Sequence, residues 1–307
     1  MPGGTPATPR ITSLSEATLE DRVDALQARY ENCDLCGHEC GVDRTAGETG
    51  VCDLDASVAV ASAGPHHGEE PPLRGRNGSG TVFLSACNLH CVFCQNFEIS
   101  QEGRGRTITA AELGETILDL QARGCHNVNF VSPTHVSPHV VEALQLIRDQ
   151  LTVPIVWNCG GFERAEVLEL LDGIVDIYMP DVKWSSEELA VRYSNAPGYW
   201  SHVREALAEM HRQVGDLTVE DGLATGGLLV RHLVMPNHEQ NSLDVLTFLA
   251  NELSRDTSVN VMDQYRPHYE VRGTDQYEEI DRPISTAEYE AVISHGNELG
   301  LTRMQYG

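Results

Sequence analysis

The sequence predicts an α/β protein built around a partial (β/α)6 barrel. From residue 81 onward, short apolar runs alternate six times with longer segments of helical periodicity. The apolar runs are nearly continuous, as in parallel strands whose two faces are covered by helices. Six units are too few to close an eight-unit barrel, so we predict an open, TIM-like partial barrel. A doubly wound sheet is the competing arrangement.

The predicted strands indicate where the chemistry lies. They span residues 81–85, 127–131, 154–158, 174–179, 228–234 and 258–262. In both competing folds, the carboxyl ends of the parallel strands form the edge that carries the active site. We therefore expect the functional residues directly after these strands, an expectation that depends on no motif.

The predicted helices carry start and stop signals. Thr109 with Glu112, and Ser285 with Glu288, have the spacing of a capping box. Ser137 is the predicted N-cap of another helix, with proline at its first helical position. The helices are predicted over 109–124, 137–151, 163–171, 186–194, 200–214, 241–254 and 285–300.

The segment before the barrel has a different amino-acid composition. A helix is predicted over 16–30, followed by CDLCGHECGVDRTAGETGVC, which is rich in cysteine and glycine. Its cysteines, Cys33, Cys36, Cys40 and Cys52, provide the four thiolates of a closed metal site. Zinc would make the segment a folding unit, whereas a second iron–sulfur cluster would make it an electron relay or substrate anchor. The spacing leaves both open. We predict a metal-binding module over 1–75 and the barrel over 76–307.

The net charge of the chain limits the kinds of partner that it can bind. It has 46 acidic and 21 basic residues, a net charge of −25, and Lys183 is its single lysine. A negative field repels phosphate backbones, which argues against nucleic-acid binding. The acidic, nearly lysine-free composition resembles that of proteins from extreme halophiles, in which salt screens self-repulsion. A G+C-rich genome would explain the arginine but not the excess of carboxylates.

The sequence also predicts a location. The N-terminus has neither the basic nor the apolar region of a signal peptide, and no stretch approaches 18 uninterrupted apolar residues. We therefore expect a cytoplasmic protein with no membrane span. In that compartment, clustered cysteines are ligands more often than disulfides.

Three cysteines follow the first predicted strand within eight residues. Cys87, Cys91 and Cys94 have the spacing C-x3-C-x2-C, at the carboxyl end of a strand. A tight loop of this kind can bind three corners of a cubane iron–sulfur cluster and leave the fourth iron open for a small molecule. Three thiolates without a nearby fourth are a poor closed zinc site.

These residues resemble the signature of the radical S-adenosylmethionine (SAM) superfamily, with Phe93 at the aromatic position before the last cysteine. Further likeness to the subfamily homologous to the pyruvate formate-lyase-activating enzyme lies in CNLHCVFCQN, GEEPPLRGRNGSGTVF, DIYMPDVKW, YSNAP, RHLVMPNH and NVMDQYRP. The resemblance covers about residues 30 to 270. It implies a partial barrel, a [4Fe–4S] cluster on the three cysteines, bound SAM, and production of a 5′-deoxyadenosyl radical that abstracts hydrogen.

The resemblance also implies roles for residues after the other strands. In the activating enzymes, a Gly-Gly-Glu motif after the second strand receives the amino group of SAM. Here SPTH stands in its place, so Ser132 and Thr134 are the available acceptors. The Asp-x-Lys pattern places Asp181 and Lys183 near the SAM carboxylate, and Arg231 is expected to contribute from the fifth strand.

Two substrate classes remain open for such an enzyme. One is a glycine backbone in a partner protein, as in activation of a glycyl radical enzyme, and the other is a small molecule. Either requires an electron donor such as ferredoxin or flavodoxin. A different class, a non-catalytic iron–sulfur electron carrier, would need fully ligated clusters, and no obvious fourth cysteine lies near Cys87, Cys91 and Cys94.

Overall fold

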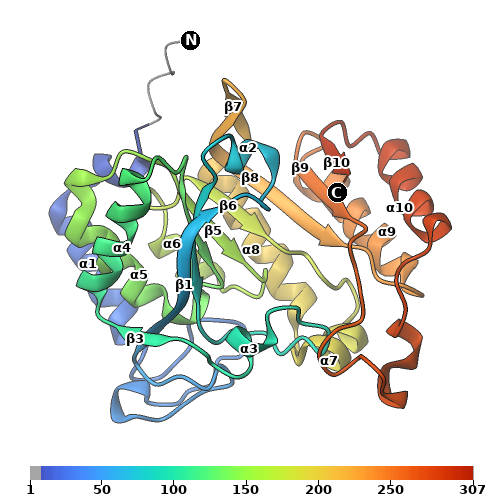
Figure 1. The fold of residues 1–307 in the computed structure, drawn as a ribbon, viewed down its shortest axis with the longest axis horizontal. Helices are drawn as coiled ribbons and strands as arrows, with labels where there is room; N and C mark the ends of the chain where they lie inside the picture. Colours follow the sequence, from blue (N-terminus) through green and yellow to red (C-terminus); the bar gives the residue numbers. More distant parts are fainter. Residues whose placement is uncertain (1–7, 307) are drawn as a thin grey trace.

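The computed structural model describes residues 8–306, which form a mixed α/β fold around one ten-stranded sheet (Figure 1). Seven neighbouring strands of this sheet are parallel. Their spatial order is β2, β4, β5, β6, β8, β9, β10, the same as their order in the chain. A doubly wound sheet reverses its strand order at a switch point, whereas a barrel does not. The open partial barrel predicted from the sequence is therefore confirmed.

All six predicted strands are present in this parallel set. They are β2 (Ser79–Leu84), β4 (Val128–Val131), β5 (Ile155–Cys159), β6 (Ile177–Pro180), β8 (Leu223–Leu233) and β9 (Ser258–Met262). The short β10 (Met304–Tyr306) extends the parallel set beyond β9. β1 (Val58–His66) and β3 (Arg106–Ile108) add two antiparallel strands at the other edge, and β7 (Thr218–Glu220) forms a hairpin with β8.

The helices follow the predicted pattern. They are α1 (Glu16–Ala28), α4 (Ala110–Ala122), α5 (Ser137–Ile147), α6 (Ala165–Leu170), α7 (Glu187–Ser194), α8 (Tyr199–Val214), α9 (Glu239–Phe248) and α10 (Thr286–Glu298), with short helices α2 (Pro71–Arg74) and α3 (Phe97–Ser100). Both predicted capping boxes are formed. The predicted cap of α5 is wrong: Val136 holds the N-cap position and Ser137 is already helical, because the chain enters α5 directly from the 3-10 turn Thr134–Val136.

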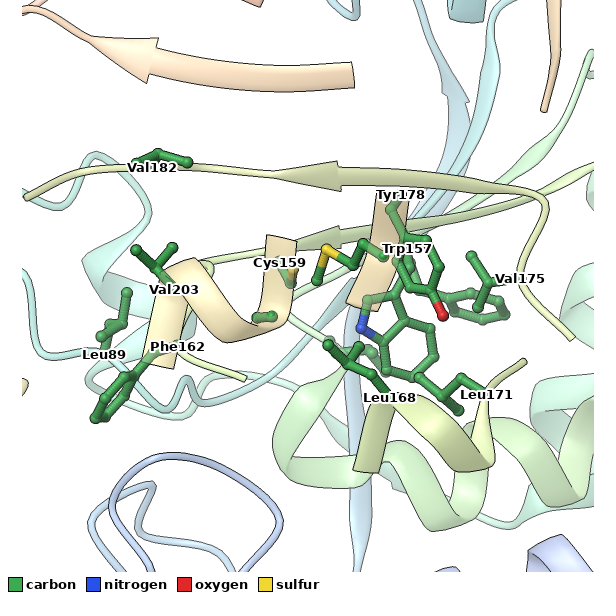
Figure 2. Close-up of a cluster of buried hydrophobic side chains, with 14 of the residues drawn as sticks. Leu89, Trp157, Cys159, Phe162, Leu168, Leu171, Val175, Tyr178, Val182 and Val203 are labelled. Atoms are coloured by element: carbon green, nitrogen blue, oxygen red, sulfur yellow. The ribbon is translucent and has the colours of Figure 1, made fainter. Parts of the chain in front are cut away.

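The core lies between the sheet and its covering helices. Figure 2 shows Trp157 of β5 packed over Leu168 and Leu171 at the end of α6. Tyr178 of β6 belongs to the same buried cluster, and its hydroxyl donates to Gln213 of α8. This packing fixes β5 and β6 from one face, so the residues at their carboxyl ends have rigid support.

The N-terminal segment joins the same layers. α1 packs against α5 and α6, and β1 pairs with β2 along the sheet (Figure 1). Leu19 and Leu26 of α1 are fully buried in the main core. The division of the chain into a module over 1–75 and a barrel over 76–307 stays a prediction. No helix among residues 8–306 is long and apolar enough to cross a membrane.

We expect the folded state to depend on salt. The net charge of −25 is spread over a chain of 307 residues, so like charges repel one another across the surface. The Debye length falls from about 10 Å at 0.1 M salt to about 3 Å at 1 M, which removes most of this repulsion. The thermal midpoint, followed by circular dichroism, is therefore expected to rise between 0.1 M and 2 M KCl. An unchanged midpoint would contradict the resemblance to halophile proteins.

Candidate active site

Residues from the carboxyl ends of six strands line two adjoining cavities. The smaller, about 170 Å³, is here called the cysteine cavity, and the larger, about 820 Å³, the barrel cavity. Both are lined by Cys91, Cys94, Asn158, Asp181, Lys183 and Arg231. Cys87 and Ser132 line the cysteine cavity, and Phe93 lines the barrel cavity. The structure thus brings together, at the ends of the strands, most of the residues that were selected from the sequence.

The cysteine loop begins with a sharp turn after β2. Ala86 has a φ of 65°, a conformation that a residue with a side chain rarely adopts, and it reverses the chain into the loop. The thiol of Cys91 lies 3.1 Å from the Ser194 hydroxyl, and the thiol of Cys94 lies 3.1 Å from that of Ser100. Phe93 packs edge-on against Trp184, with the ring centroids 5.9 Å apart.

Burial alters the acidity of these thiols. It raises the pKa of Cys87 to about 11 and that of Cys91 to about 12. The positive charge of Lys183 acts in the opposite direction on both thiols, because it favours the thiolate. Cys87 and Cys91 therefore lie beside a fixed cation, which stabilises nearby negative charge.

A partly buried charge network connects β5, β6 and β8 at the cavity wall. Lys183 Nζ lies 2.6 Å from Asp181 Oδ2, and Arg231 Nε donates to Asp181 Oδ1 over 2.7 Å. Arg231 Nη2 also donates to Asn158 Oδ1 over 2.8 Å. Although burial opposes its ionisation, Arg231 and Lys183 together lower the pKa of Asp181 to about 2. Asp181 therefore stays ionised and fixes both cations at the cavity wall.

Comparison with known proteins gives this arrangement a family. A model of the Radical SAM superfamily matches residues 81–226. The chain is 31% identical over 294 residues to the uncharacterized protein MJ0674 of Methanocaldococcus jannaschii, covering 92% of this chain and 79% of that protein. The chain belongs to the radical SAM superfamily. The likeness to the pyruvate formate-lyase-activating enzyme subfamily stays a prediction.

Two solved structures are similar to parts of this chain. Streptococcus suis SuiB bound to S-adenosylmethionine matches with a TM-score of 0.50 and 9% identity, over 72% of this chain and 48% of that one. Methylornithine synthase (PylB) matches with a TM-score of 0.48 and 16% identity, over 74% of this chain and 63% of that one. The chain thus spans less than two thirds of either protein, and at these identities the SuiB match supports the fold alone.

Membership in the superfamily implies a [4Fe–4S] cluster and SAM, and the cysteine loop fits such a cluster. Its three thiols line the same cavity, and Cys87 and Cys91 are both within electrostatic reach of Lys183. A cubane takes one thiolate at each of three separate irons, so its ligands need not converge on one point. Among residues 8–306, no three His, Cys, Asp or Glu side chains converge closely enough to hold a single metal ion.

The residues expected to receive the amino group of SAM differ in position. Ser132 lines the cysteine cavity, with its hydroxyl 3.7 Å from the thiol of Cys87. Thr134 is buried behind it, and its hydroxyl donates to Glu163 Oε1 over 2.7 Å. Thr134 does not line either cavity, because the chain turns into the helical segment before α5 at this residue. Its side chain supports Glu163 instead.

The four N-terminal cysteines lie close to one another and to the cysteine loop. Cys52 interacts electrostatically with both Cys33 and Cys40. His38, between Cys36 and Cys40, makes a 2.8 Å hydrogen bond to the Asn88 carbonyl within the cysteine loop. A zinc ion or a second iron–sulfur cluster on these four cysteines stays a prediction, and either would sit on a segment that contacts the loop directly.

The sequence did not single out every residue of the site. Glu69, Glu70 and Asn260 line the barrel cavity, although the two glutamates precede the first parallel strand. The strand-end rule cannot find them, because they enter the barrel from the loop between β1 and α2. The only available signal was the adjacent acidic pair flanked by glycine and proline in GEEPP.

Replacing Lys183 by alanine is expected to weaken SAM binding about ten- to hundred-fold while the cluster stays intact. Lys183 is the partly buried ammonium group at the cavity wall, and a charge-assisted hydrogen bond to a carboxylate contributes about 1.5–3 kcal/mol. Lys183→Arg is expected to rescue only part of the affinity, because a planar guanidinium places its charge differently. Titration of SAM into both reconstituted proteins measures this. Equal affinities of the wild type and Lys183→Ala for SAM would show that Lys183 does not contact SAM.

Proposed function

We propose that this protein is a radical SAM enzyme that binds a [4Fe–4S] cluster through Cys87, Cys91 and Cys94 and cleaves SAM in the adjoining cavity. When bound, the cluster supplies one electron to SAM, which releases methionine and a 5′-deoxyadenosyl radical. The observation that carries the proposal is the meeting of the three thiols with Lys183 and Asp181 at one cavity. These groups come from different strand ends, as a barrel active site requires.

The chain's own residues have distinct roles in this proposal. Lys183 pairs with the carboxylate of SAM, while Asp181 holds Lys183 and Arg231 in place and keeps both charged. Ser132 is the acceptor for the amino group of SAM. Its φ of 56° is rare for a residue with a side chain and turns the chain at the cavity rim. Phe93 and Trp184 form an apolar support beneath the loop and keep water from its inner side.

Two classes of substrate are proposed. Superfamily chemistry requires a hydrogen donor near SAM, and a glycine backbone of a glycyl radical enzyme and a small molecule are the two classes that the sequence favours. The volume of the barrel cavity, about 820 Å³, lies in the range of sites for small ligands and supports the small-molecule class. The electron donor is proposed to be a ferredoxin or flavodoxin.

The test is anaerobic reconstitution with iron and sulfide, followed by reduction and addition of SAM. A SAM-dependent change in the EPR spectrum of the reduced cluster, together with formation of 5′-deoxyadenosine, is the expected result. The alternative of an electron carrier requires a fully ligated cluster. A cluster whose EPR spectrum is unchanged by SAM would therefore favour the carrier and refute the enzyme.

A further inference from the structure

Two adjacent glutamates line the barrel cavity beside Arg231. Glu69 and Glu70 connect β1 to α2, and only 9% and 6% of their surfaces are exposed. Carboxylates are seldom buried to this degree unless they are paired with a cation. Their immediate partners therefore determine what the cavity can hold.

The nearby arginine does not satisfy this pair. Arg231 Nη1 lies 3.7 Å from Glu69 Oε2 and 4.0 Å from Glu70 Oε1, both longer than a hydrogen bond. Its Nε and Nη2 are already committed to Asp181 and Asn158. Arg74 and Arg266 also line the barrel cavity, but among residues 8–306 neither forms an ion pair with Glu69 or Glu70.

Two acceptor atoms next to this pair lack donors. Asn260 Nδ2 donates to Glu70 Oε1 over 3.0 Å. Glu70 Oε2 and Asn260 Oδ1 are both buried, and neither has a hydrogen-bond partner among the described residues. Glu70 and Asn260 both line the barrel cavity. A ligand that fits here therefore has to donate hydrogen bonds.

The charges point to the same kind of ligand. Three carboxylates, Glu69, Glu70 and Asp181, and four cations, Lys183, Arg231, Arg74 and Arg266, line the barrel cavity, and Asp181 is the close ion-pair partner of both Lys183 and Arg231. Burial and the neighbouring Glu70 raise the pKa of Glu69 to about 7, against the opposing effect of Arg231. Lys183 and Arg231 are thus engaged by Asp181, and Glu69 and Glu70 are left without a cation at hydrogen-bond distance.

We propose that Glu69 and Glu70 bind a cationic nitrogen group, an ammonium or a guanidinium, of the substrate in the barrel cavity. The inference rests on the proposed function, because it assigns the substrate side of that same site. The paired carboxylates accept from the cation, and Asn260 Oδ1 accepts a further N–H. The substrate class is therefore an amine, a guanidine or a cationic side chain of a peptide.

The test measures binding of butylammonium, with butyrate and 1-butanol as probes of equal chain length. Saturation-transfer NMR on the reconstituted protein is run without and with saturating SAM. Butylammonium is expected to bind in both cases, at least about tenfold more tightly than butyrate or butanol. Glu69→Gln and Glu70→Gln are each expected to weaken its binding about tenfold or more. Glu205→Gln, on an exposed face of α8, removes the same charge and is expected to leave binding unchanged.

Each contrary result has a definite meaning. Equal binding of the three probes by the wild type would overturn the proposal, even if both glutamate variants failed to fold. Displacement of butylammonium by SAM would assign the glutamates to SAM and overturn the substrate role. The binding measurement does not depend on catalysis. Cation binding without formation of 5′-deoxyadenosine would refute only the proposed function. Formation of 5′-deoxyadenosine without cation binding would refute only this inference.

Discussion

Replacing Cys91 by alanine is expected to abolish formation of 5′-deoxyadenosine, to the level of the protein without its cluster. Cys91 is the middle thiol of the loop and lines both cavities. Its thiol is held beside Ser194, whose hydroxyl also accepts a 2.8 Å hydrogen bond from the Trp184 indole. Alanine leaves two thiolates, which cannot bind three corners of a cubane. Iron content and the EPR spectrum after anaerobic reconstitution provide the measurement.

The matched control is Cys125→Ala. Cys125 is also buried, but it precedes β4 at the opposite end of the strand and lines neither cavity. Its replacement is expected to cost about 1 kcal/mol of stability and to leave the iron content and SAM cleavage intact. If Cys91→Ala retained a SAM-responsive cluster, the three cysteines would not be its ligand set.

The fold was largely predictable because its signals are local. Buried parallel strands such as β4 and β5 are short, continuous apolar runs, and each predicted run coincides with a strand. Thr109 with Glu112 and Ser285 with Glu288 mark helix starts by contacts within four residues. Local chemistry of this kind needs no knowledge of the rest of the chain.

Elements that depend on distant pairing were not predicted. β1 contains VAVASAGPH, which has no strong strand pattern, and it is held by pairing with β2 and β3. β10 has three residues and exists through its pairing with β9. A strand this short has little intrinsic preference, so tertiary context decides its structure.

The same division applies to the candidate site. Asp181, Lys183 and Ser132 were found because strand ends of a parallel sheet meet at one edge. Thr134 was expected beside them, but its side chain contacts Glu163 and does not face the cavity. Within a turn, neighbouring residues point in different directions, and the sequence does not show which of them faces the cavity. Glu69 and Glu70 reach the site from the short loop between β1 and α2, and nothing in the local sequence states which cavity a loop will line.

Replacing Asp181 by asparagine is expected to destabilise the protein by about 2–4 kcal/mol at pH 7. Asp181 pairs with both Lys183 and Arg231, and Lys183 has no other ion-pair partner among residues 8–306. Breaking a buried ion pair leaves an uncompensated charge at a cost of about 3–5 kcal/mol. Because these side chains are only partly buried, and because Glu69 and Glu70 still lie near Arg231, we expect a cost below the middle of that range, about 2–4 kcal/mol. Urea denaturation of the metal-free protein gives the free energy of unfolding.

The pH dependence of the stability lost in Asp181→Asn shows whether the charge of Asp181 is its cause. The folded pKa of Asp181 is lowered to about 2, below its value of about 3.9 in an unfolded chain. The stabilisation from its charge is thus complete above about pH 4 and lost as the pH falls toward 2. The difference between wild type and Asp181→Asn is therefore expected to stay constant from pH 5 to pH 8. Asp119→Asn is the control, because it breaks an exposed ion pair with Arg123 and is expected to cost under about 1 kcal/mol. A cost for Asp181→Asn no greater than for this control would mean that the network at the cavity wall is solvated, and Lys183 would then be free to move away from SAM.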